Sequence, residues 1–507
     1  MKSLSSKNIL FSVIILAIAV HAARGLGFIR EIIVAKQIGP SQETDAVYLA
    51  LQIVLVAASA VVISLPDVVI GEITKNKLEK DKGTHIWSGL WGISITLIFL
   101  ATVMFLFSPL IVRIVASGAS YKIQSMSVHI LKHFSWFIVF RGQMVYLTAV
   151  CHAERKFCVP AVFEFFFPLG GIIGILLFGK QIGAKSILYG ALFGILLAVS
   201  GLVLYVNFAV QKISMNIKLK TLWCNGIIKN FLVVLAGAYI FRIELNVLSW
   251  TIAQFGTTGG IFLLSVAIGL VNITLILPNF VIKRVALPEI VSFHVHGESE
   301  LFIKSIFRTC QIILMLVLPL CVVFLYNTEE CISIIYKGGA FTNTSVTNLA
   351  TLVRGWAGFS WIIAICLLFE SVVISTSHGK WITVGRVLYI IILIAFCNAF
   401  GSYFGNGAVG WAVVMATTCR FIYVINVFRK ISKLSTLTLL YHLGKIFIYI
   451  ILITTIGFLF KLLPLSNNLI RIIISGAGLL VFSLLFSWMV FLINPFNFSL
   501  GNLYGQK

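Results

Sequence analysis

The chain has 507 residues, of which 60% are hydrophobic and only 11% are charged, whereas soluble proteins carry about 25% charged residues. So little charge cannot cover a water-exposed globule of this size, which excludes soluble enzymes, and the high apolar content excludes a disordered protein. The formal net charge of +22 lies in short strips between apolar runs. We therefore interpret the positive excess as membrane topology rather than nucleic-acid binding, and predict a polytopic membrane protein.

About 20 apolar residues make one helical membrane crossing, and at that length the chain has about 14 candidate spans. The apolar runs are continuous rather than alternating, which rejects a β-barrel and predicts an all-α fold. The expected spans lie near 9–34, 45–65, 87–115, 129–150, 159–178, 186–209, 228–252, 260–282, 305–326, 355–376, 384–404, 408–427, 445–463 and 469–493.

The first span begins like a signal peptide. Lys2 and Lys7 precede an apolar stretch, and His21-Ala-Ala is a passable cleavage site. The apolar pattern nevertheless continues to Lys36 without a break into polar sequence. We therefore expect a retained first helix.

Charged residues in the first two spans are the main functional candidates, because a charge at the membrane centre costs roughly 2.5–3.5 kcal/mol. Arg24 and Arg30 lie in the first span, and Asp45 opens the second. One interpretation is that Arg24 and Arg30 line a cavity and bind an anionic head group, since guanidinium groups suit phosphate oxygens. The other is that Arg24 pairs with a carboxylate, while Arg30 and Glu31 reach the interface.

Further charges lie in the seventh and tenth spans. Arg242 is a candidate for substrate binding, and Glu244, Asn246 and Glu370 are candidates for binding a coupling ion. A structural ion pair of Arg242 with Glu244 or Glu370 is the alternative. We interpret the remaining intramembrane charges Arg141, Glu164 and Arg420 as packing or interface groups.

Basic residues alternate regularly between the two sides of the expected spans. With the N-terminus in the cytoplasm, they concentrate in the inside loops, which predicts an even number of spans and a cytoplasmic C-terminus. The inside loops carry Lys75, Lys77, Lys80, Lys82, Arg155, Lys156, Lys212, Lys218, Lys220, Lys229, Lys283, Arg284, Lys304, Lys380, Arg386, Arg429, Lys430 and Lys433. The outside loops hold mainly Lys36, Lys122, Lys180, Lys185, Lys337 and Lys461.

Similar short motifs recur in both halves of the chain at nearly constant spacing. Leu65-Pro-Asp-Val-Val is matched by Leu287-Pro-Glu-Ile-Val. Ile114-Val-Ala-Ser-Gly118 is likewise matched by Ile335-Tyr-Lys-Gly-Gly339. This repetition predicts two six-helix lobes in parallel repeat, at 1–212 and 213–430. Residues 431–507 would add two C-terminal helices, with an interfacial connector near Arg429–Lys445. Gly190-x-x-x-Gly194 predicts a close helix contact within the first lobe.

The sequence has no pattern typical of a metal site, a nucleophile or an ATP-binding loop, so we expect no cofactor and no enzymatic activity. The nine cysteines are scattered through apolar stretches. His129 and His133 share a helical face, and we interpret them as an interfacial pair rather than as metal ligands, since no cysteine or carboxylate is near in sequence. A coupling cation or the membrane potential is the expected driving force.

The first two spans carry a recognisable motif. Arg24-Gly-Leu-Gly-Phe-Ile-Arg30-Glu31, followed by Thr44-Asp45-Ala46, resembles the opening signature of the MurJ/MviN-type lipid II flippases of the MOP exporter superfamily. Further matching segments are Cys151–Ala161 and Lys337–Thr342, and the resemblance covers roughly residues 10–430.

This resemblance implies a monomeric transporter of the bacterial inner membrane that serves cell-wall synthesis. It would move an undecaprenyl-pyrophosphate-linked glycan from the inner to the outer leaflet by alternating access. Arg24, Arg30 and Asp45 match residues that the family requires. The chain departs from the family where it reads Ala267-Ile-Gly269 instead of Ala-Asp-Arg, and where 57–66 lacks charge. A related lipid-linked oligosaccharide is therefore an alternative to lipid II.

Two other functions compete with this hypothesis. A MATE-like cation or drug antiporter of the same superfamily would rely on Glu244 and Glu370 instead of Arg24. A membrane-embedded glycan polymerase or ligase would need a large outer loop with catalytic residues, and the loops of this chain are short.

Overall fold

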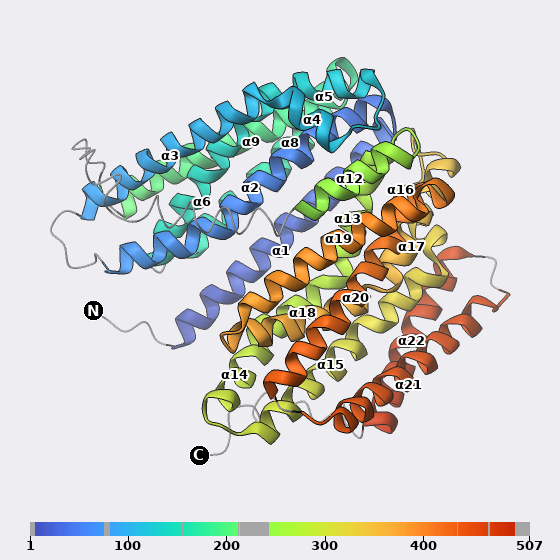
Figure 1. Cartoon of the computed structure of the whole chain (residues 1–507). Helices are drawn as coiled ribbons and strands as arrows, with labels where there is room; N and C mark the ends of the chain where they lie inside the picture. Colours follow the sequence, from blue (N-terminus) through green and yellow to red (C-terminus); the bar gives the residue numbers. More distant parts are fainter. Residues whose placement is uncertain are drawn as a thin grey trace. The chain divides into compact units, whose positions relative to one another are not determined.

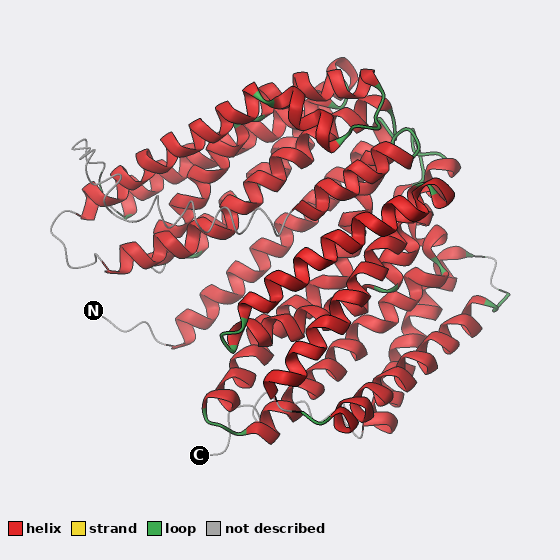
Figure 2. Cartoon of the chain, viewed as in Figure 1, coloured by secondary structure: helices red, strands yellow, loops and turns green. Residues whose placement is uncertain are grey.

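The structure, a computed structural model, describes residues 6–75, 82–154, 156–210, 212, 243–432, 434–464 and 467–491. These residues form helices joined by short connections (Figures 1 and 2). Within these ranges there is no β-strand, and a single bridge joins Gly338 to Phe341. The predicted all-α fold is confirmed.

The chain divides into two compact units. Unit 1 comprises Met1–Phe262 and Gly338–Phe341, and unit 2 comprises Leu263–Lys337 and Thr342–Lys507. The predicted lobe boundary falls at residue 212, and residues 213–242 lie outside the described residues. The division into 1–212, 213–430 and 431–507 therefore stays a prediction.

The helices of unit 1 are α1 (Ser6–Gln37), α2 (Gln42–Lys75), α3 (Lys82–Leu106), α4 (Ser108–Val115), α5 (Tyr121–Phe134), α6 (Phe137–Ala153), α7 (Cys158–Phe163), α8 (Phe166–Ile182), α9 (Lys185–Ala209), α12 (Ile243–Phe255) and the first residues of α13 (Gly260–Phe280). Those of unit 2 are the rest of α13, the π-helix η1 (Val281–Ala286), α14 (Leu287–Val295), α15 (Ser299–Tyr326), α16 (Thr328–Tyr336), α17 (Asn343–Gly358), α18 (Ser360–Ser375), α19 (Gly379–Phe404), α20 (Asn406–Ser432), α21 (Thr436–Lys461) and α22 (Asn468–Phe491).

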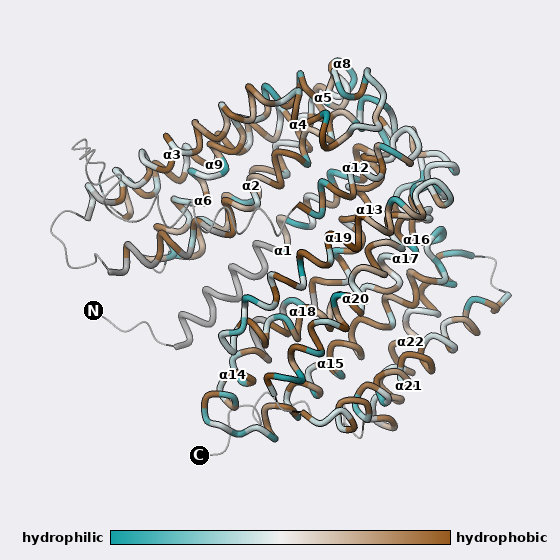
Figure 3. Tube along the Cα trace, in the orientation of Figure 1, coloured by the Kyte–Doolittle hydropathy of each residue, from teal (hydrophilic) through white to brown (hydrophobic). Residues whose placement is uncertain are grey.

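Among the described residues, nine helices are long and apolar enough to cross a membrane, and two bent pairs bring the number to as many as 11. The bent pairs are α5 with α6, at 41°, and α17 with α18, at 42°. α1 and α13 coincide with the predicted spans near 9–34 and 260–282. Figure 3 shows that apolar residues dominate the helices. The chain is a multi-pass membrane protein.

The segment predicted as an interfacial connector is mostly helical. α20 continues to Ser432, and α21 begins at Thr436, where Ser435 accepts a hydrogen bond of 3.1 Å from the Thr438 amide. The predicted connector Arg429–Lys445 therefore contains the end of one helix and the first turns of the next.

Helices α8 and α9 approach each other through glycines. Gly170 and Gly174 face Gly190 and Gly194, and a Cβ at Gly190 would lie 2.2 Å from the Gly170 carbonyl oxygen. The close contact predicted at Gly190-x-x-x-Gly194 is confirmed. Because this oxygen belongs to the backbone, a side chain at residue 190 must push the two helices apart.

We expect Gly190→Ala to destabilise unit 1 by about 1–3 kcal/mol, because overpacking a tight contact strains both helices. Thermal unfolding of the purified protein in detergent measures the loss. Gly444→Ala is the matched control, since a Cβ at Gly444 meets nothing within 4 Å. An equal thermal midpoint for the two variants would contradict the described packing.

In unit 2, Glu330 of α16 connects the two C-terminal helices to the rest of the unit. Its Oε1 accepts a hydrogen bond of 2.6 Å from Lys461 of α21 and lies 3.5 Å from Arg471 of α22. Burial alone would raise the pKa of the Glu330 carboxyl. The hydrogen bond from Lys461 and the two positive charges outweigh burial and hold this pKa below its usual value of 4.5.

A carboxyl group with a lowered pKa in the folded state stabilises the fold above its unfolded pKa, and this stabilisation disappears as the pH falls through the folded pKa. We therefore expect Glu330→Gln to lower the thermal midpoint at neutral pH. The difference from the wild type should vanish in acid, once Glu330 is protonated. A difference that stays constant with pH would show that the ion pairs do not contribute.

Candidate functional site

Arg24 lies on an open face of α1. The Arg24 side chain is exposed, and a Cβ at Gly25 or Gly27 would meet nothing within 4 Å. Within the described part of the chain, the Arg24 guanidinium makes no hydrogen bond or ion pair. In contrast, Val34 and Ala35, further along the same helix, are fully buried. α1 is therefore packed at its C-terminal end and open around Arg24.

Arg30, which follows Arg24 by less than two helical turns, is buried in a polar network. Its Nη2 lies 2.6 Å from Glu31 Oε1, and the Tyr48 hydroxyl of α2 donates to Glu31 Oε2. The guanidinium also lies over the Phe167 ring of α8, 5.8 Å from its centroid. This network neutralises Arg30 inside unit 1 and links α1 to α2 and α8.

The Asp45 carboxylate, which is 2% exposed, holds the beginning of α13. Its Oδ2 accepts a hydrogen bond of 2.6 Å from the amide of Gly259. Its Oδ1 accepts bonds of 2.9 and 3.0 Å from Ile261 and Phe262. The first amides of a helix have no partner within the helix and carry a partial positive charge, so a carboxylate stabilises them.

The segment Gly338–Phe341, which is distant in sequence, also contacts the turn between α1 and α2. The Ala340 amide donates a hydrogen bond of 2.9 Å to the Lys36 carbonyl. Gly39 and Gly339 both have positive φ, at 71° and 56°, and a Cβ on either would touch backbone at 2.6 Å or less. Glycine is therefore required at both positions. The turn of residues 36–45 thus holds the 338–341 segment as well as the start of α13.

The candidates in the seventh predicted span are only partly described, and Arg242 lies outside the described residues. Glu244 is half-buried in the first turn of α12. Asn246 Oδ1 is buried and has no hydrogen-bond donor among the described residues. Nearby, Gln52 of α2 donates a bond of 2.7 Å to the Leu245 carbonyl and accepts one of 2.6 Å from Ser249.

In unit 2, Glu370 of α18 is 2% exposed and meets two arginines. Its Oε1 accepts from Arg420 of α20, and its Oε2 lies 3.2 Å from Arg386 of α19. Arg420 also lies over the Tyr389 ring, 5.3 Å from its centroid. From the sequence, Arg386 was expected in a cytoplasmic loop and Arg420 as a packing group. The sequence signal that connects them is one acidic and two basic residues in three consecutive expected spans.

Among the described residues, no three His, Cys, Asp or Glu side chains gather closely enough to hold a metal ion. The cysteines of this part of the chain are free thiols, and most of them are buried.

Comparison with known proteins identifies the family. The family model described as MurJ, lipid II flippase, matches residues 34–465. The chain belongs to this family. It is therefore a transporter and not an enzyme, and the predicted resemblance is confirmed.

Two relatives that match by sequence are distant from this chain. The probable lipid II flippase MurJ of Thermotoga maritima is 21% identical over 431 residues, which are 82% of this chain and 85% of that protein. The lipid II flippase MurJ of Thermosipho africanus is 26% identical over 192 residues, covering 38% of this chain and 40% of that protein.

Solved structures show the same fold. A lipid II flippase MurJ in an inward closed conformation matches with a TM-score of 0.79 at 17% identity, covering 95% of this chain and all of that one. An inward-facing multidrug-resistance MATE transporter of the MOP superfamily matches with a TM-score of 0.67 at 11% identity, covering 82% and 96%.

We expect Asp45→Ala to destabilise the protein by about 1–3 kcal/mol, because three buried amides lose their acceptor. Asp45→Asn keeps an acceptor oxygen but loses the charge, so its effect should be smaller. Hydrogen exchange of the Gly259, Ile261 and Phe262 amides measures this effect locally: these amides should exchange faster in both variants. Unchanged protection of the amides in Asp45→Ala would contradict the described capping.

Proposed function

We propose that this chain moves an undecaprenyl-pyrophosphate-linked glycan, lipid II or a related cell-envelope unit, from the inner to the outer leaflet by alternating access. Membership of the MurJ family and the names of its relatives support this substrate class. The observation that carries the proposal is the exposed Arg24 on the open face of α1.

Arg24 provides what a diphosphate needs in a membrane. Desolvating an ionised group costs many kcal/mol, so a diphosphate crosses only when polar groups replace its water. A guanidinium offers planar, charge-assisted hydrogen bonds that match phosphate oxygens. Placing Arg24 in an apolar helix is itself costly, and an anionic ligand at an aqueous surface offsets that cost.

Arg30 and Asp45 have a different proposed role. Both are buried, and both already have partners inside unit 1: Arg30 has Glu31, and Asp45 has three backbone amides. We assign them to positioning, in which Arg30 fixes α1 against α8 and Asp45 fixes the start of α13. Arg242 remains a proposed contributor to substrate binding.

The coupling ion is proposed to bind at α12 rather than at Glu370. Two guanidiniums already contact the Glu370 carboxylate, one at each oxygen, so it has little capacity left for a cation. Asn246 Oδ1 of α12 is buried and has no hydrogen-bond donor among the described residues, so it is the oxygen that we propose contacts the ion, and Glu244 lies two residues before it. The cation antiporter alternative relied on the Glu370 carboxylate. Because this carboxylate is already paired with two arginines, that alternative is weakened as well.

The proposed location is the bacterial inner membrane, with both termini in the cytoplasm. The concentration of lysine and arginine in alternate loops supports this orientation. We expect the protein to act as a monomer.

The choice between lipid II and a related glycan rests on the two departures from the family pattern, the uncharged stretch 57–66 and the glycine at position 269. At Gly269, where the family carries arginine, a Cβ would meet nothing within 4 Å, so the position has room for a side chain. The absence of that cationic contact favours a substrate with fewer or different anionic contacts than lipid II.

The decisive test uses cells depleted of their own lipid II flippase, in which translocation is measured by the access of a periplasmic enzyme to the lipid-linked glycan. We expect Arg24→Ala to reduce translocation roughly tenfold to hundredfold, the loss typical of a hydrogen bond between charged groups. Arg24→Lys should retain part of the activity because it keeps the charge.

Arg113→Ala is the matched control, because Arg113 is an exposed arginine of the same unit at the end of α4. All variants must reach equal amounts in the membrane. Wild-type translocation by Arg24→Ala would overturn the proposal. If the wild-type chain moves another polyprenyl-linked glycan but not lipid II, the substrate is the related unit, and Gly269→Arg should then increase lipid II translocation.

A further inference from the structure

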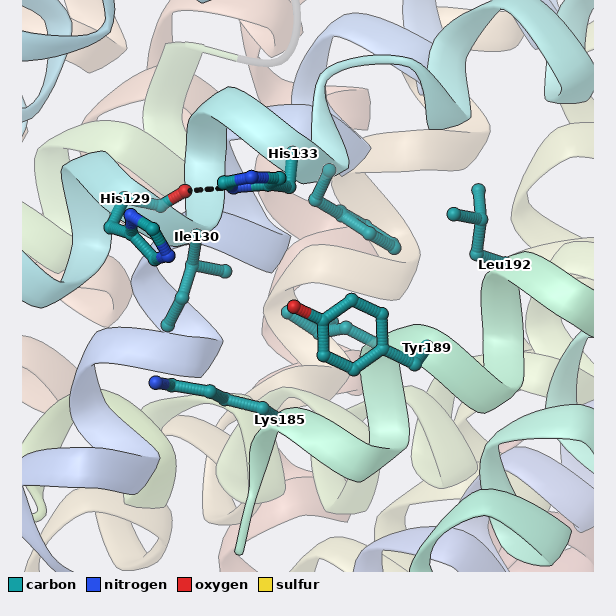
Figure 4. Close-up of a pocket in the computed structure, with 8 residues that line it drawn as sticks. His129, Ile130, His133, Lys185, Tyr189 and Leu192 are labelled. Atoms are coloured by element: carbon teal, nitrogen blue, oxygen red, sulfur yellow. Dashed lines mark hydrogen bonds between the residues drawn. The ribbon is translucent and has the colours of Figure 1, made fainter. Parts of the chain in front are cut away.

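A cleft on the exposed side of unit 1 combines positive charge with an apolar wall. It lies between α5 and α9 (Figure 4). Its polar lining is His129, His133, Lys185 and Tyr189, and its apolar lining is Ile130, Phe134, Leu188 and Leu192. Neither the family assignment nor the proposed translocation uses this cleft, which is built from residues far along the chain from Arg24.

The polar groups gather toward one end. Figure 4 shows the Lys185 ammonium beneath His129, with His133 above and the Tyr189 hydroxyl turned toward the same space, whereas Leu192 lies at the opposite side. Both histidines are exposed, and Tyr189 is 52% exposed. His133 Nδ1 lies 2.9 Å from the His129 carbonyl, which fixes the orientation of the ring. Since this contact places a proton on Nδ1, the other ring nitrogen, Nε2, can donate to an anion when the ring is in its imidazolium form.

No acidic residue lines the cleft. Glu43 of α2 is the carboxylate beside Lys185, and its Oε1 accepts a hydrogen bond of 2.8 Å from the Ala184 amide. This carboxylate therefore caps the start of α9. The groups that line the cleft and can carry charge, Lys185, His129 and His133, are therefore all basic, which is complementary to an anion.

The order of residues along α9 matches a lipid. Lys185 is the first residue of the helix, at the expected membrane boundary, and Leu188 and Leu192 follow at successive turns toward its middle. A phospholipid has the same order, with the anionic phosphate at the boundary and the acyl chain below it. Tyrosine, with an apolar ring and a polar tip, is typical of this depth.

We propose that the α5–α9 cleft binds an anionic phospholipid, with the phosphate between Lys185, His129 and His133 and an acyl chain along Leu188 and Leu192. In the proposed orientation, this lipid belongs to the outer leaflet. The site is separate from the transported substrate, so the protein should keep it whether or not Arg24 binds a diphosphate.

The test is thermal stabilisation of the full-length protein in a neutral detergent by added short-chain phosphatidylglycerol. A ligand that binds only the folded state raises the thermal midpoint with concentration, which yields an apparent affinity. We expect Lys185→Gln to weaken this affinity about tenfold, the effect of losing one charge-assisted contact. Lys180→Gln is the matched control, since Lys180 is an exposed lysine near the same end of the bundle that does not line the cleft.

A second variant, Leu192→Trp, keeps all of the charges and fills the apolar end, so it should also weaken binding. Each variant must have the wild-type midpoint without lipid, and His129→Gln replaces Lys185→Gln if that variant is unstable. Equal stabilisation by phosphatidylcholine would overturn the proposal, because the phosphatidylglycerol charge would then have no role. Equal stabilisation by inorganic phosphate, or an equal loss in Lys180→Gln, would also overturn it, since both indicate nonspecific anion binding.

Discussion

A charged group in hydrocarbon needs an opposite charge, a set of hydrogen-bond donors or water, and this requirement organises both units. Glu31 is held by Arg30 and Tyr48, Asp45 by three backbone amides, and Glu370 by two arginines. Each carboxylate joins at least two elements, and Asp45 joins α2 to residues more than 200 positions along the chain. Removing one partner would leave the other charged and buried, which is why such groups are costly to change.

The turn between α1 and α2 shows how this requirement serves function. Within ten residues it provides the Lys36 carbonyl, the Gly39 contact and the Asp45 carboxylate, and these hold residues 338–341 and the first turn of α13. The C-terminal half of α1 is thus held firmly, whereas the turn that carries Arg24 is left open. A transporter needs this combination of a rigid support and an accessible charge.

Sequence predicted the elements of this fold better than the partners of its charges. Within the described ranges, most expected spans coincide with helices because the length of an apolar run is a local property, although several of these helices are broken or bent. The partners of Asp45 were not predictable, since residues 259–262 come from the far end of the unit and contribute backbone amides, which no side-chain pattern reveals. Arg386 was assigned to a loop because it lies close to the start of its predicted span. The charges themselves were visible in the sequence, but which helices meet was not.

The most direct measurement of the central claim is the water accessibility of residue 24. The nine cysteines are replaced, and a single cysteine is introduced by Arg24→Cys or, as a buried control, by Val34→Cys. A membrane-impermeant thiol reagent is then applied to both faces of the membrane. The account predicts rapid labelling at residue 24 and no labelling at residue 34. An unreactive cysteine at residue 24 would show that the Arg24 position does not meet water, and would contradict the account.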